Sequence, residues 1–425
     1  MELLWYTSAT CLPADKVQQK INSTILVGLK KNLMKIFQSI LCLLLFVSNN
    51  LHAQDYKKIH FKAILIDTHN DIISTCIDGG YSFDANLKGK TYSDLQRMKE
   101  AGVDVQIFSI WCDGEQKNPF AFANREIDTL YAWCNRNSDK MMIVKTPEQL
   151  MQAVKQHKLG CMMGVEGGHM IENDLLKLDS LFKRGVRYMT LTWNNSNPWA
   201  TSAMEETHDS LLHQPKGLSD FGKQIVMRMN ELGMMVDLSH VGEKTFWDAI
   251  NTTSKPVIVS HSCAYSLCPV FRNLKDDQIK AVGKNGGVIC INFYSGFIDS
   301  NFEKHNTAFM AEHKAEFDSL RKSGKPEFYG QLYLYTKYKN ESEQFRPPLS
   351  MLLDHLDYIV KLIGVDHVGL GSDFDGINSA PQQLNEITDY PLITQELVKR
   401  GYSKKDIYKI LGGNFIRVFK ANEVK

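Results

Sequence analysis

The chain contains 425 residues, with 49 Lys and Arg against 48 Asp and Glu, so its formal net charge is +1. Hydrophobic residues make up 43% of the sequence and charged residues 23%, which is typical of a globular protein with a large core. This balance provides no clustered positive field for neutralising phosphates, so we expect no nucleic-acid partner.

A short apolar run near the N-terminus has the flanks of a secretory signal. Three lysines between positions 30 and 35 precede the apolar run 40–47, and the small residue Ala53 follows at the expected cleavage point. The run is shorter than the roughly 20 apolar residues that a membrane span needs. We therefore predict that residues 1–53 are an upstream extension plus signal peptide, with Met34 as the true start. The alternative is a buried core helix, which the polar flanks disfavour.

This interpretation makes the protein exported, to the periplasm or outside the cell, and leaves residues 54–425 as one domain. Seven of the nine cysteines lie in that domain, which allows disulfides but does not require them. Cys268 and Cys290 are one open pairing. No Cys-x-x-Cys pair occurs, which argues against a thiolate zinc knuckle or a thioredoxin-like site.

From residue 61 onward, short apolar runs alternate with helical patterns that end in glycine. The runs are 64–66, 103–109, 160–164, 188–192, 234–238, 257–259, 288–292 and 368–371. One helical pattern starts at Ser93 and another covers Phe221 to Leu232, before Gly233. Continuous apolar strands separated by helices predict a parallel sheet covered on both faces. Eight such units favour an α/β fold of the closed (β/α)8 TIM-like barrel type over an open sheet.

One segment interrupts this alternation. Residues 298–349 are charged and aromatic, with four tyrosines between Tyr329 and Tyr338. An insertion of this length in a barrel is either a lid or binding element, or a solvent-exposed helical addition, and the sequence favours neither.

Histidine and carboxylate side chains follow five of the eight runs. They are His69, Asp71, Glu166, His240, His261 and Asp373. Barrel enzymes build their active sites at these strand ends, and alternation along the chain puts His69 and Asp71 on one side. A lone histidine or a strand-end aspartate is usually structural, but six such residues at matching positions are hard to obtain by packing alone.

The types of these side chains indicate the metal. Imidazole and carboxylate without thiolate suit zinc better than manganese, cobalt or iron. Five ligands exceed what one tetrahedral zinc needs, and they suit two ions about 3.5 to 4 Å apart with a bridging carboxylate. Such a pair holds a hydroxide at neutral pH and polarises a carbonyl, so we expect hydrolysis of an amide or a related bond.

Several longer motifs occur in one order. They are Asp67-Thr68-His69-Asn70-Asp71, Val165-Glu166-Gly167-Gly168-His169, Asp237-Leu238-Ser239-His240-Val241, Ser260-His261-Ser262 and Gly371-Ser372-Asp373-Phe374-Asp375-Gly376. With these motifs the sequence resembles the membrane (renal) dipeptidase family of zinc metallopeptidases, from about Ile64 to Phe419. The resemblance implies a metal-dependent hydrolase barrel that cleaves dipeptides with a dizinc-bound hydroxide, and a homodimer as one oligomeric state.

The resemblance also implies roles for individual residues. His69 and Asp71 would bind one Zn²⁺, His240 and His261 the second, and Glu166 would bridge the two ions. Asp373 would be the catalytic acid and base. Arg272 would bind the C-terminal carboxylate of the substrate, a task that suits its planar guanidinium; a surface ion pair is the alternative.

One position departs from the family pattern. Many members have Leu-Thr-His where this chain has Leu191-Thr192-Trp193, and that histidine helps to position the reacting carbonyl. An indole donates one hydrogen bond but carries no proton or charge. Trp193 and Asn194 are therefore candidate substrate-binding residues, although a tryptophan packed without substrate contact is the alternative. Hydrolysis of another amide, a lactam or an ester, or weak activity in a peptide-binding homologue, remain rival functions.

Overall fold

The computed structural model describes residue 15 and residues 56–208, 215–325 and 327–424. The predicted signal segment therefore lies outside the described residues. Among the helices that are described, none is long and apolar enough to cross a membrane.

A closed parallel barrel forms the centre of the domain. Its strands are β1 (Leu65–Asn70), β2 (Val103–Trp111), β4 (Leu159–Glu166), β5 (Val186–Thr190), β6 (Met235–Asp237), β7 (Ile258–Val259), β8 (Val288–Ile291) and β9 (Val368–Leu370). Neighbours in the sheet follow the order β2-β1-β9-β8-β7-β6-β5-β4, and the pairing of β2 with β4 closes the ring. The predicted (β/α)8 barrel and its eight strands are confirmed.

The sequence analysis missed one short strand. β3 (Met141–Ile143) pairs with the first residues of β4, Leu159 to Cys161, and lies outside the ring. A run of three apolar residues shows no periodicity that distinguishes a strand from the end of a helix, so this strand could not be predicted from the sequence.

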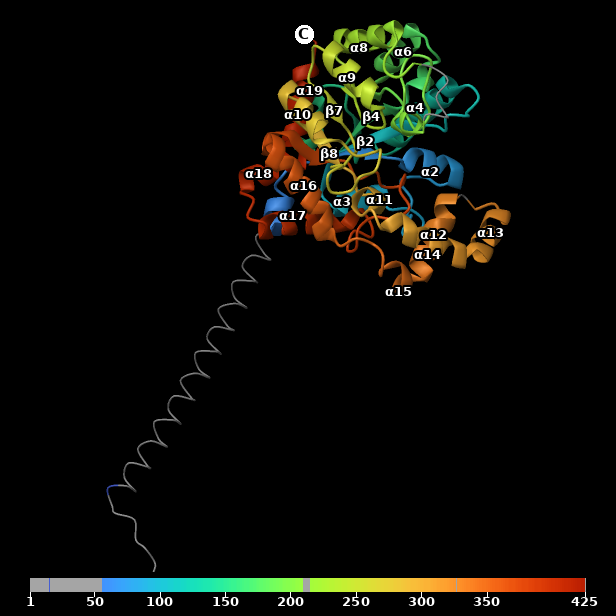
Figure 1. Cartoon of the computed structure of the whole chain (residues 1–425), viewed down its shortest axis with the longest axis vertical. Coiled ribbons are helices and arrows are strands. Elements are labelled where there is room, and N and C mark those ends of the chain that lie inside the picture. The colour runs from blue at the N-terminus through green and yellow to red at the C-terminus, as the bar shows by residue number, and fades with distance from the viewer. Residues whose placement is uncertain (1–14, 16–55, 209–214, 326, 425) are drawn as a thin grey trace, which may run out of the picture. The chain divides into compact units, whose positions relative to one another are not determined.

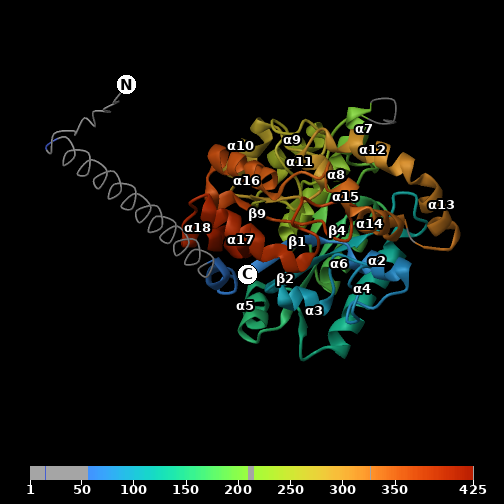
Figure 2. The ribbon, with the colours of Figure 1, turned by 90° about the horizontal axis from the view of Figure 1, so that it is seen from below.

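Helices surround the strands in both views of the ribbon (Figures 1 and 2). In chain order the longer ones are α2 (Ile72–Gly79), α3 (Leu95–Glu100), α4 (Pro119–Arg136), α5 (Pro147–Lys155), α6 (Leu175–Arg184), α8 (Asp220–Leu232), α9 (Glu243–Thr252), α10 (Asp276–Asn285), α16 (Leu349–Ile363), α17 (Tyr390–Lys399) and α19 (Asn414–Asn422). Short helices α7 (Ala203–Thr207), α11 (Ser295–Ile298) and α18 (Lys404–Tyr408) lie in the connections.

Capping residues define the helix ends. α8 begins after Ser219, whose side chain accepts a hydrogen bond from the Gly222 N–H, and ends at Gly233 with φ 80°. The cap of α3 is one residue later than we predicted. Asp94, not Ser93, accepts from the Arg97 N–H, because the Ser93 hydroxyl donates to Asp375.

Alternate residues of the strands face two different cores. Val105 and Ile107 of β2 belong to a cluster with Tyr188 and Met235, whereas Phe108 and Ile110 pack with the residues of the surrounding helices. Small residues make room inside the cluster, since a Cβ on Gly164 would lie 2.0 Å from the Tyr188 ring. The large side chain of Tyr188 thus occupies space that glycine leaves in β4.

Four helices occupy most of the irregular segment that the sequence predicts between residues 298 and 349. They are α12 (Phe302–Glu312), α13 (Lys314–Lys322), α14 (Glu327–Lys337) and α15 (Lys339–Ser342), and we call them the helical segment. They lie together in both views (orange in Figures 1 and 2). Phe309, Leu334 and Tyr335 form a small core of their own there.

Candidate functional site

The C-terminal ends of the barrel strands open into a pocket of about 830 Å³. Predicted site residues line it: Asp71, Glu166, Trp193, Asn194, His240, Arg272 and Asp373. His69 and His261 are fully buried directly beside Glu166. The helical segment contributes Glu303 and residues 327–329 to the pocket wall. The insertion therefore combines features of both predicted alternatives, because it is a helical addition that also lines the pocket.

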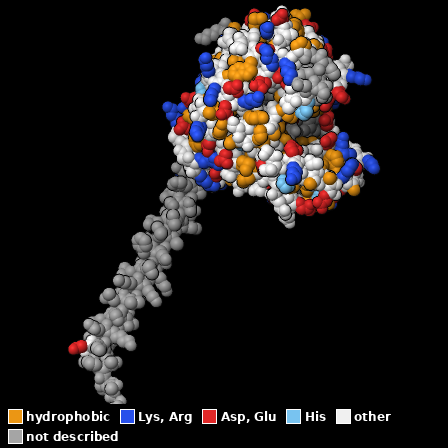
Figure 3. Space-filling model, in the orientation of Figure 1, with side chains coloured by type: hydrophobic (Ala, Val, Ile, Leu, Met, Phe, Trp, Pro, Cys, Tyr) orange, Lys and Arg blue, Asp and Glu red, His pale blue; other side chains and the backbone are white. Residues whose placement is uncertain are grey.

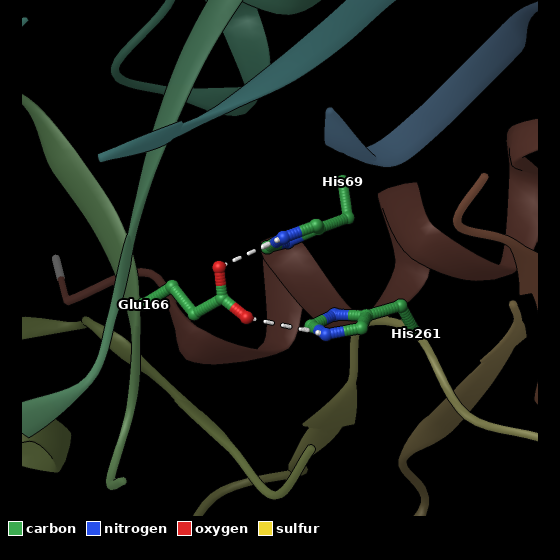
Figure 4. Close-up of side chains that lie close together, drawn as sticks. All are labelled: His69, Glu166 and His261. Atoms are coloured by element: carbon green, nitrogen blue, oxygen red, sulfur yellow. Dashed lines mark ion pairs between the residues drawn. The ribbon is translucent and has the colours of Figure 1, made fainter. Parts of the chain in front are cut away.

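Three imidazoles point at the carboxylate of Glu166 (Figure 4 shows two of them). The Nε2 atom of His69 lies 3.2 Å from Glu166 Oε2, and the Nε2 atoms of His240 and His261 lie 2.8 and 3.4 Å from Oε1. His69 Nε2 also lies 3.5 Å from Asp71 Oδ2. One carboxylate thus stands between ligands from β1 on one side and from the β6 and β7 ends on the other.

Hydrogen bonds at the opposite ring nitrogens define the tautomers. The Tyr188 hydroxyl donates to the Thr68 carbonyl (3.0 Å), so it accepts from His69 Nδ1 (2.9 Å). Ser260 Oγ donates to Asp237 (2.6 Å) and therefore accepts from His261 Nδ1 (2.8 Å). These bonds leave the Nε2 atom of each ring as a lone-pair acceptor.

His240 is held in the same way. Its Nδ1 donates to Asn194 Oδ1 (3.1 Å), so its Nε2 is also an acceptor, and that atom lies 3.0 Å from the Nε2 of His261. Two acceptors at this distance repel each other unless a cation lies between or beside them.

The cluster therefore fits a metal site. Its converging atoms are imidazole lone pairs and carboxylate oxygens, and buried His69 Nε2 and Asp71 Oδ1 have no hydrogen-bond partner. Two overlapping groups of residues could hold an ion, one with His69, Glu166 and His261, and one with His69, Asp71 and Asp373. A nitrogen and oxygen ligand set without sulfur suits zinc.

Burial and charge act on the pKa values of these ligands. Burial, together with the positive charge of Arg272, lowers the pKa of His240 to about 4, and burial also lowers the pKa of His261. Burial opposes protonation of His69 too, but Tyr188, Glu166 and Asp71 outweigh it and raise its pKa. Neutral His240 and His261 are ready to bind a cation, and at His69 a metal ion competes with a proton.

Unusual backbone geometry places two of the side chains. His240 (φ 62°) and Asp373 (φ 61°) are in the left-handed region, which non-glycine residues rarely adopt. The Asp373 N–H donates to the His69 carbonyl (3.1 Å), so this turn is tied to the end of β1. Both turns direct a side chain into the pocket at a cost in backbone energy.

Asp373 is partly buried next to the candidate metal ligands. Its Oδ2 accepts a hydrogen bond from Asn292 Nδ2 (2.8 Å), and burial raises the pKa of its carboxyl well above the ordinary range. A carboxyl with a raised pKa can exchange a proton near neutral pH, which is what a general acid and base requires.

Arg272 is a buried cation with weak hydrogen bonds. Only 5% of its surface is exposed, and its Nη atoms donate to Ser262 Oγ (3.4 Å) and the His261 carbonyl (3.3 Å). Its guanidinium lies over the ring of Phe297, 5.2 Å from the centroid. Within the described ranges no carboxylate forms an ion pair with it, so a surface ion pair is not its role. A buried guanidinium facing a pocket is suited to an anionic ligand.

The two candidate substrate-binding residues Trp193 and Asn194 have different surroundings. Trp193 lines the pocket and packs edge-on against Trp111, with ring centroids 5.2 Å apart. Asn194 also lines the pocket, but its side-chain oxygen is engaged by His240. Asn194 therefore orients a candidate metal ligand.

Several residues that support the site had no role assigned to them from the sequence. They are Ser109, Tyr188, Asp237, Ser260 and Asn292. Asp237 stands three residues before His240 in a quoted motif and was within reach of sequence reasoning. Asp67 accepts from the Ser372 N–H and hydroxyl and holds the end of β9.

The seven cysteines of the domain are all free, so the open pairing of Cys268 with Cys290 is not formed. Both thiols are buried, and each has a pKa raised by burial. They act as small apolar core residues.

Comparisons with known proteins identify the family. Residues 53–425 match the family model of membrane dipeptidases, peptidase family M19. A Schizosaccharomyces pombe protein named an uncharacterized dipeptidase is 32% identical over 402 residues, which cover 88% of this chain and 84% of that protein. Dipeptidase 3 of Mus musculus is 30% identical over 365 residues, which cover 84% of this chain and 64% of that protein.

Solved structures share the fold. The probable dipeptidase PvdM from Pseudomonas aeruginosa has a TM-score of 0.70 at 23% identity, and covers 88% of this chain and 98% of its own. A metallopeptidase from Rhodobacter sphaeroides, solved with a phosphinate mimic of the dipeptide L-Ala-D-Ala, has a TM-score of 0.68 at 21% identity. The match covers 85% of this chain and 100% of that one. Together with the family match over nearly the whole domain, the ligand cluster leads to one conclusion: the chain belongs to the membrane dipeptidase family, and it is a zinc metallopeptidase.

Proposed function

We propose that this enzyme hydrolyses the peptide bond of dipeptides with two zinc ions held by His69, Asp71, Glu166, His240 and His261. The observation that carries the proposal is that one pocket contains both a cluster of converging imidazole and carboxylate atoms and the buried cation of Arg272, which forms no ion pair with a described carboxylate. A short substrate with a free carboxylate can reach both.

Each side chain has a distinct task. The two zinc ions would supply a nucleophile at neutral pH and polarise the scissile carbonyl. Asp373 takes a proton at its carboxylate during attack and returns it to the leaving amine. Arg272 binds the substrate's C-terminal carboxylate, and Asn194 holds His240 so that Nε2 faces the metal.

A metal count and a substrate panel test the proposal. We expect about two zinc ions per chain, hydrolysis of L,L or L,D dipeptides, and loss of activity with a chelator. If the fully metallated enzyme hydrolyses no dipeptide, the proposal is wrong. Turnover of lactams or esters alone would instead identify the rival reaction on the same barrel.

C-terminal amides test the role of Arg272 in the same assay. Because a charge-assisted hydrogen bond contributes about 1.5–3 kcal/mol, we expect kcat/KM to be about 10- to 100-fold lower for amidated dipeptides. Arg272→Ala should abolish this discrimination. Arg228→Ala, which removes a surface arginine paired with Asp179 and Glu231, should retain it. Equal kcat/KM for acids and amides in the wild-type enzyme would refute the assignment.

We also propose that the enzyme is exported after removal of residues up to Ala53. The lysines before the apolar run 40–47 and the small residue after it support this proposal. N-terminal sequencing of protein from its native host should begin at Gln54. A sequence that begins at Met1 or Met34 would contradict it.

A further inference from the structure

Two tryptophans form an aromatic pair on one side of the pocket. Trp111 is the last residue of β2, and Trp193 lies three residues beyond the end of β5. Their ring centroids are 5.2 Å apart with planes at 67°, the edge-to-face arrangement that aromatic rings favour. Both side chains are partly exposed, and both line the pocket.

The direction of Trp111 follows from strand register. Trp111 is paired in register with Glu166 on β4, and Ser109, two residues earlier on β2, donates to Glu166 Oε2 (3.2 Å). Because residues two apart in a strand share a face, Trp111 projects to the same side as the metal-ligand cluster.

The closed barrel places Trp111 across from the strand that precedes Arg272. In the ring β1-β2-β4-β5-β6-β7-β8-β9, β2 and β7 are four places apart in both directions. Arg272 follows β7 and is anchored to the His261 carbonyl. Glu166 is on β4, next to β2 in the ring, and the imidazoles of three strands meet its carboxylate in the pocket.

We propose that Trp111 and Trp193 form the wall that receives the side chain of the substrate's N-terminal residue. The inference rests on the proposed dipeptidase function. If Arg272 binds the C-terminal carboxylate and the scissile carbonyl lies at the ligand cluster, the N-terminal residue extends toward β2. The enzyme therefore prefers dipeptides that begin with an aromatic or a large aliphatic residue.

The wall is packed against its neighbours, and the pocket has room for such a side chain. Gly167 (φ 107°) lies against Trp193, since a Cβ there would be 3.2 Å from the Trp193 Cβ. Trp193 thus contacts Gly167 through its Cβ and Trp111 through its indole ring. The volume of about 830 Å³ is within the range of pockets that enclose ligands much larger than Ala-Ala.

Zinc-loaded enzyme and three dipeptides test the proposal. The measured quantity is the ratio of kcat/KM for Phe-Ala to that for Ala-Ala, with Ala-Phe as the reversed substrate. We expect a wild-type ratio well above one, which falls about tenfold in Trp111→Ala and in Trp193→Ala. Trp193→Phe should restore most of the ratio, because it keeps an aromatic face.

Phe297→Ala is the matched control, because it truncates an aromatic side chain on the Arg272 side of the pocket. We expect it to change KM for all three dipeptides and to leave the Phe-Ala to Ala-Ala ratio unaltered. If instead both tryptophan variants keep the wild-type ratio, or if only Phe297→Ala changes it, the proposal is wrong. Zinc content and circular dichroism of each variant identify misfolded protein.

A binding measurement separates failure of this proposal from failure of the proposed function. If no dipeptide is cleaved, calorimetric titration of the zinc-loaded wild-type enzyme with Phe-Ala and with Ala-Ala gives the two Kd values. Tighter binding of Phe-Ala that is lost in Trp193→Ala supports the wall even if hydrolysis fails. Equal Kd values for the two peptides overturn it.

Discussion

Acceptor atoms that face one another characterise this site. Each of the three imidazoles is held through Nδ1 by Tyr188, Asn194 or Ser260, so that Nε2 faces the Glu166 carboxylate. The sequence indicated the three histidines because they follow predicted strands. It did not indicate which side chains hold these imidazoles through Nδ1, because those contacts depend on the register between strands.

Asp373→Asn separates proton transfer from metal binding. The amide keeps the size of the side chain but cannot accept and return a proton, so we expect kcat to fall by about 10²- to 10⁴-fold. We expect the zinc content to stay at the wild-type value. Steady-state kinetics and metal analysis provide the measurement.

The exposed carboxylate of Glu231 offers a matched control, and Glu231→Gln should leave kcat unchanged. Full activity in Asp373→Asn would contradict the acid and base role. Loss of one zinc ion would instead make Asp373 a ligand, as its place beside His69 and Asp71 also allows.

At the scale of elements, the loops after the strands matter more than the strands. Gly376 lies in the loop after β9, where a Cβ would be 2.2 Å from Asp71 Oδ2 and 2.7 Å from Asp373 Oδ1. No side chain fits without displacing a carboxylate that we assign to metal binding or catalysis.

Gly376→Ala should therefore weaken zinc binding by about 10- to 100-fold, comparable to the loss of a group that orients a ligand. Competition with a chromogenic chelator measures the affinity. The far-ultraviolet circular dichroism should match that of the wild type, because the loop lies outside the barrel strands. Unchanged affinity would show that the loop shifts to accommodate the methyl group.

A buried carboxyl at the start of β2 makes stability depend on pH. Asp104 Oδ2 accepts from the Leu65 N–H at the start of β1 (2.9 Å), and burial raises the pKa of Asp104 to about 6. A raised folded-state pKa means that the folded protein binds the proton more tightly than the unfolded chain. The stabilisation is complete at pH values below the ordinary pKa of 3.8 and is lost as the pH rises through about 6.

Asp104→Asn keeps the acceptor without the charge. We expect it to raise the free energy of unfolding at pH 8 by on the order of 1 kcal/mol, with little effect at pH 4. Urea unfolding at the two pH values measures the difference. An equal effect at both values would rule out ionisation of Asp104 as the cause.

At the scale of the whole molecule, the metal ligands join distant parts of the barrel. His69, Glu166, His240 and His261 come from β1, β4 and the ends of β6 and β7. Acidic and basic side chains are interspersed over the face shown in Figure 3, which agrees with the near-neutral composition. The concentrated charge is in the pocket.

Removal of metal should therefore destabilise the whole barrel. A ligand that binds only the folded state stabilises it by about 4 kcal/mol at 1,000 times its Kd, so we expect a chelator to lower the Tm. Restored zinc should return the Tm to its original value, and the Tm should rise with zinc concentration. Calorimetry that shows the same Tm with and without chelator would contradict ligation between strands.

The sequence by itself determined the eight barrel strands, the capped helices between them and the strand-end position of the metal ligands, since these follow from periodicity and local motifs. Only the tertiary structure decided that Asn194 orients His240 across 46 residues, that Tyr188 holds His69 across 119, and that Trp111 meets Trp193. The physical reason is closure of the barrel. The register of each strand against its neighbours selects which side chains meet, and no local pattern in the chain encodes that register.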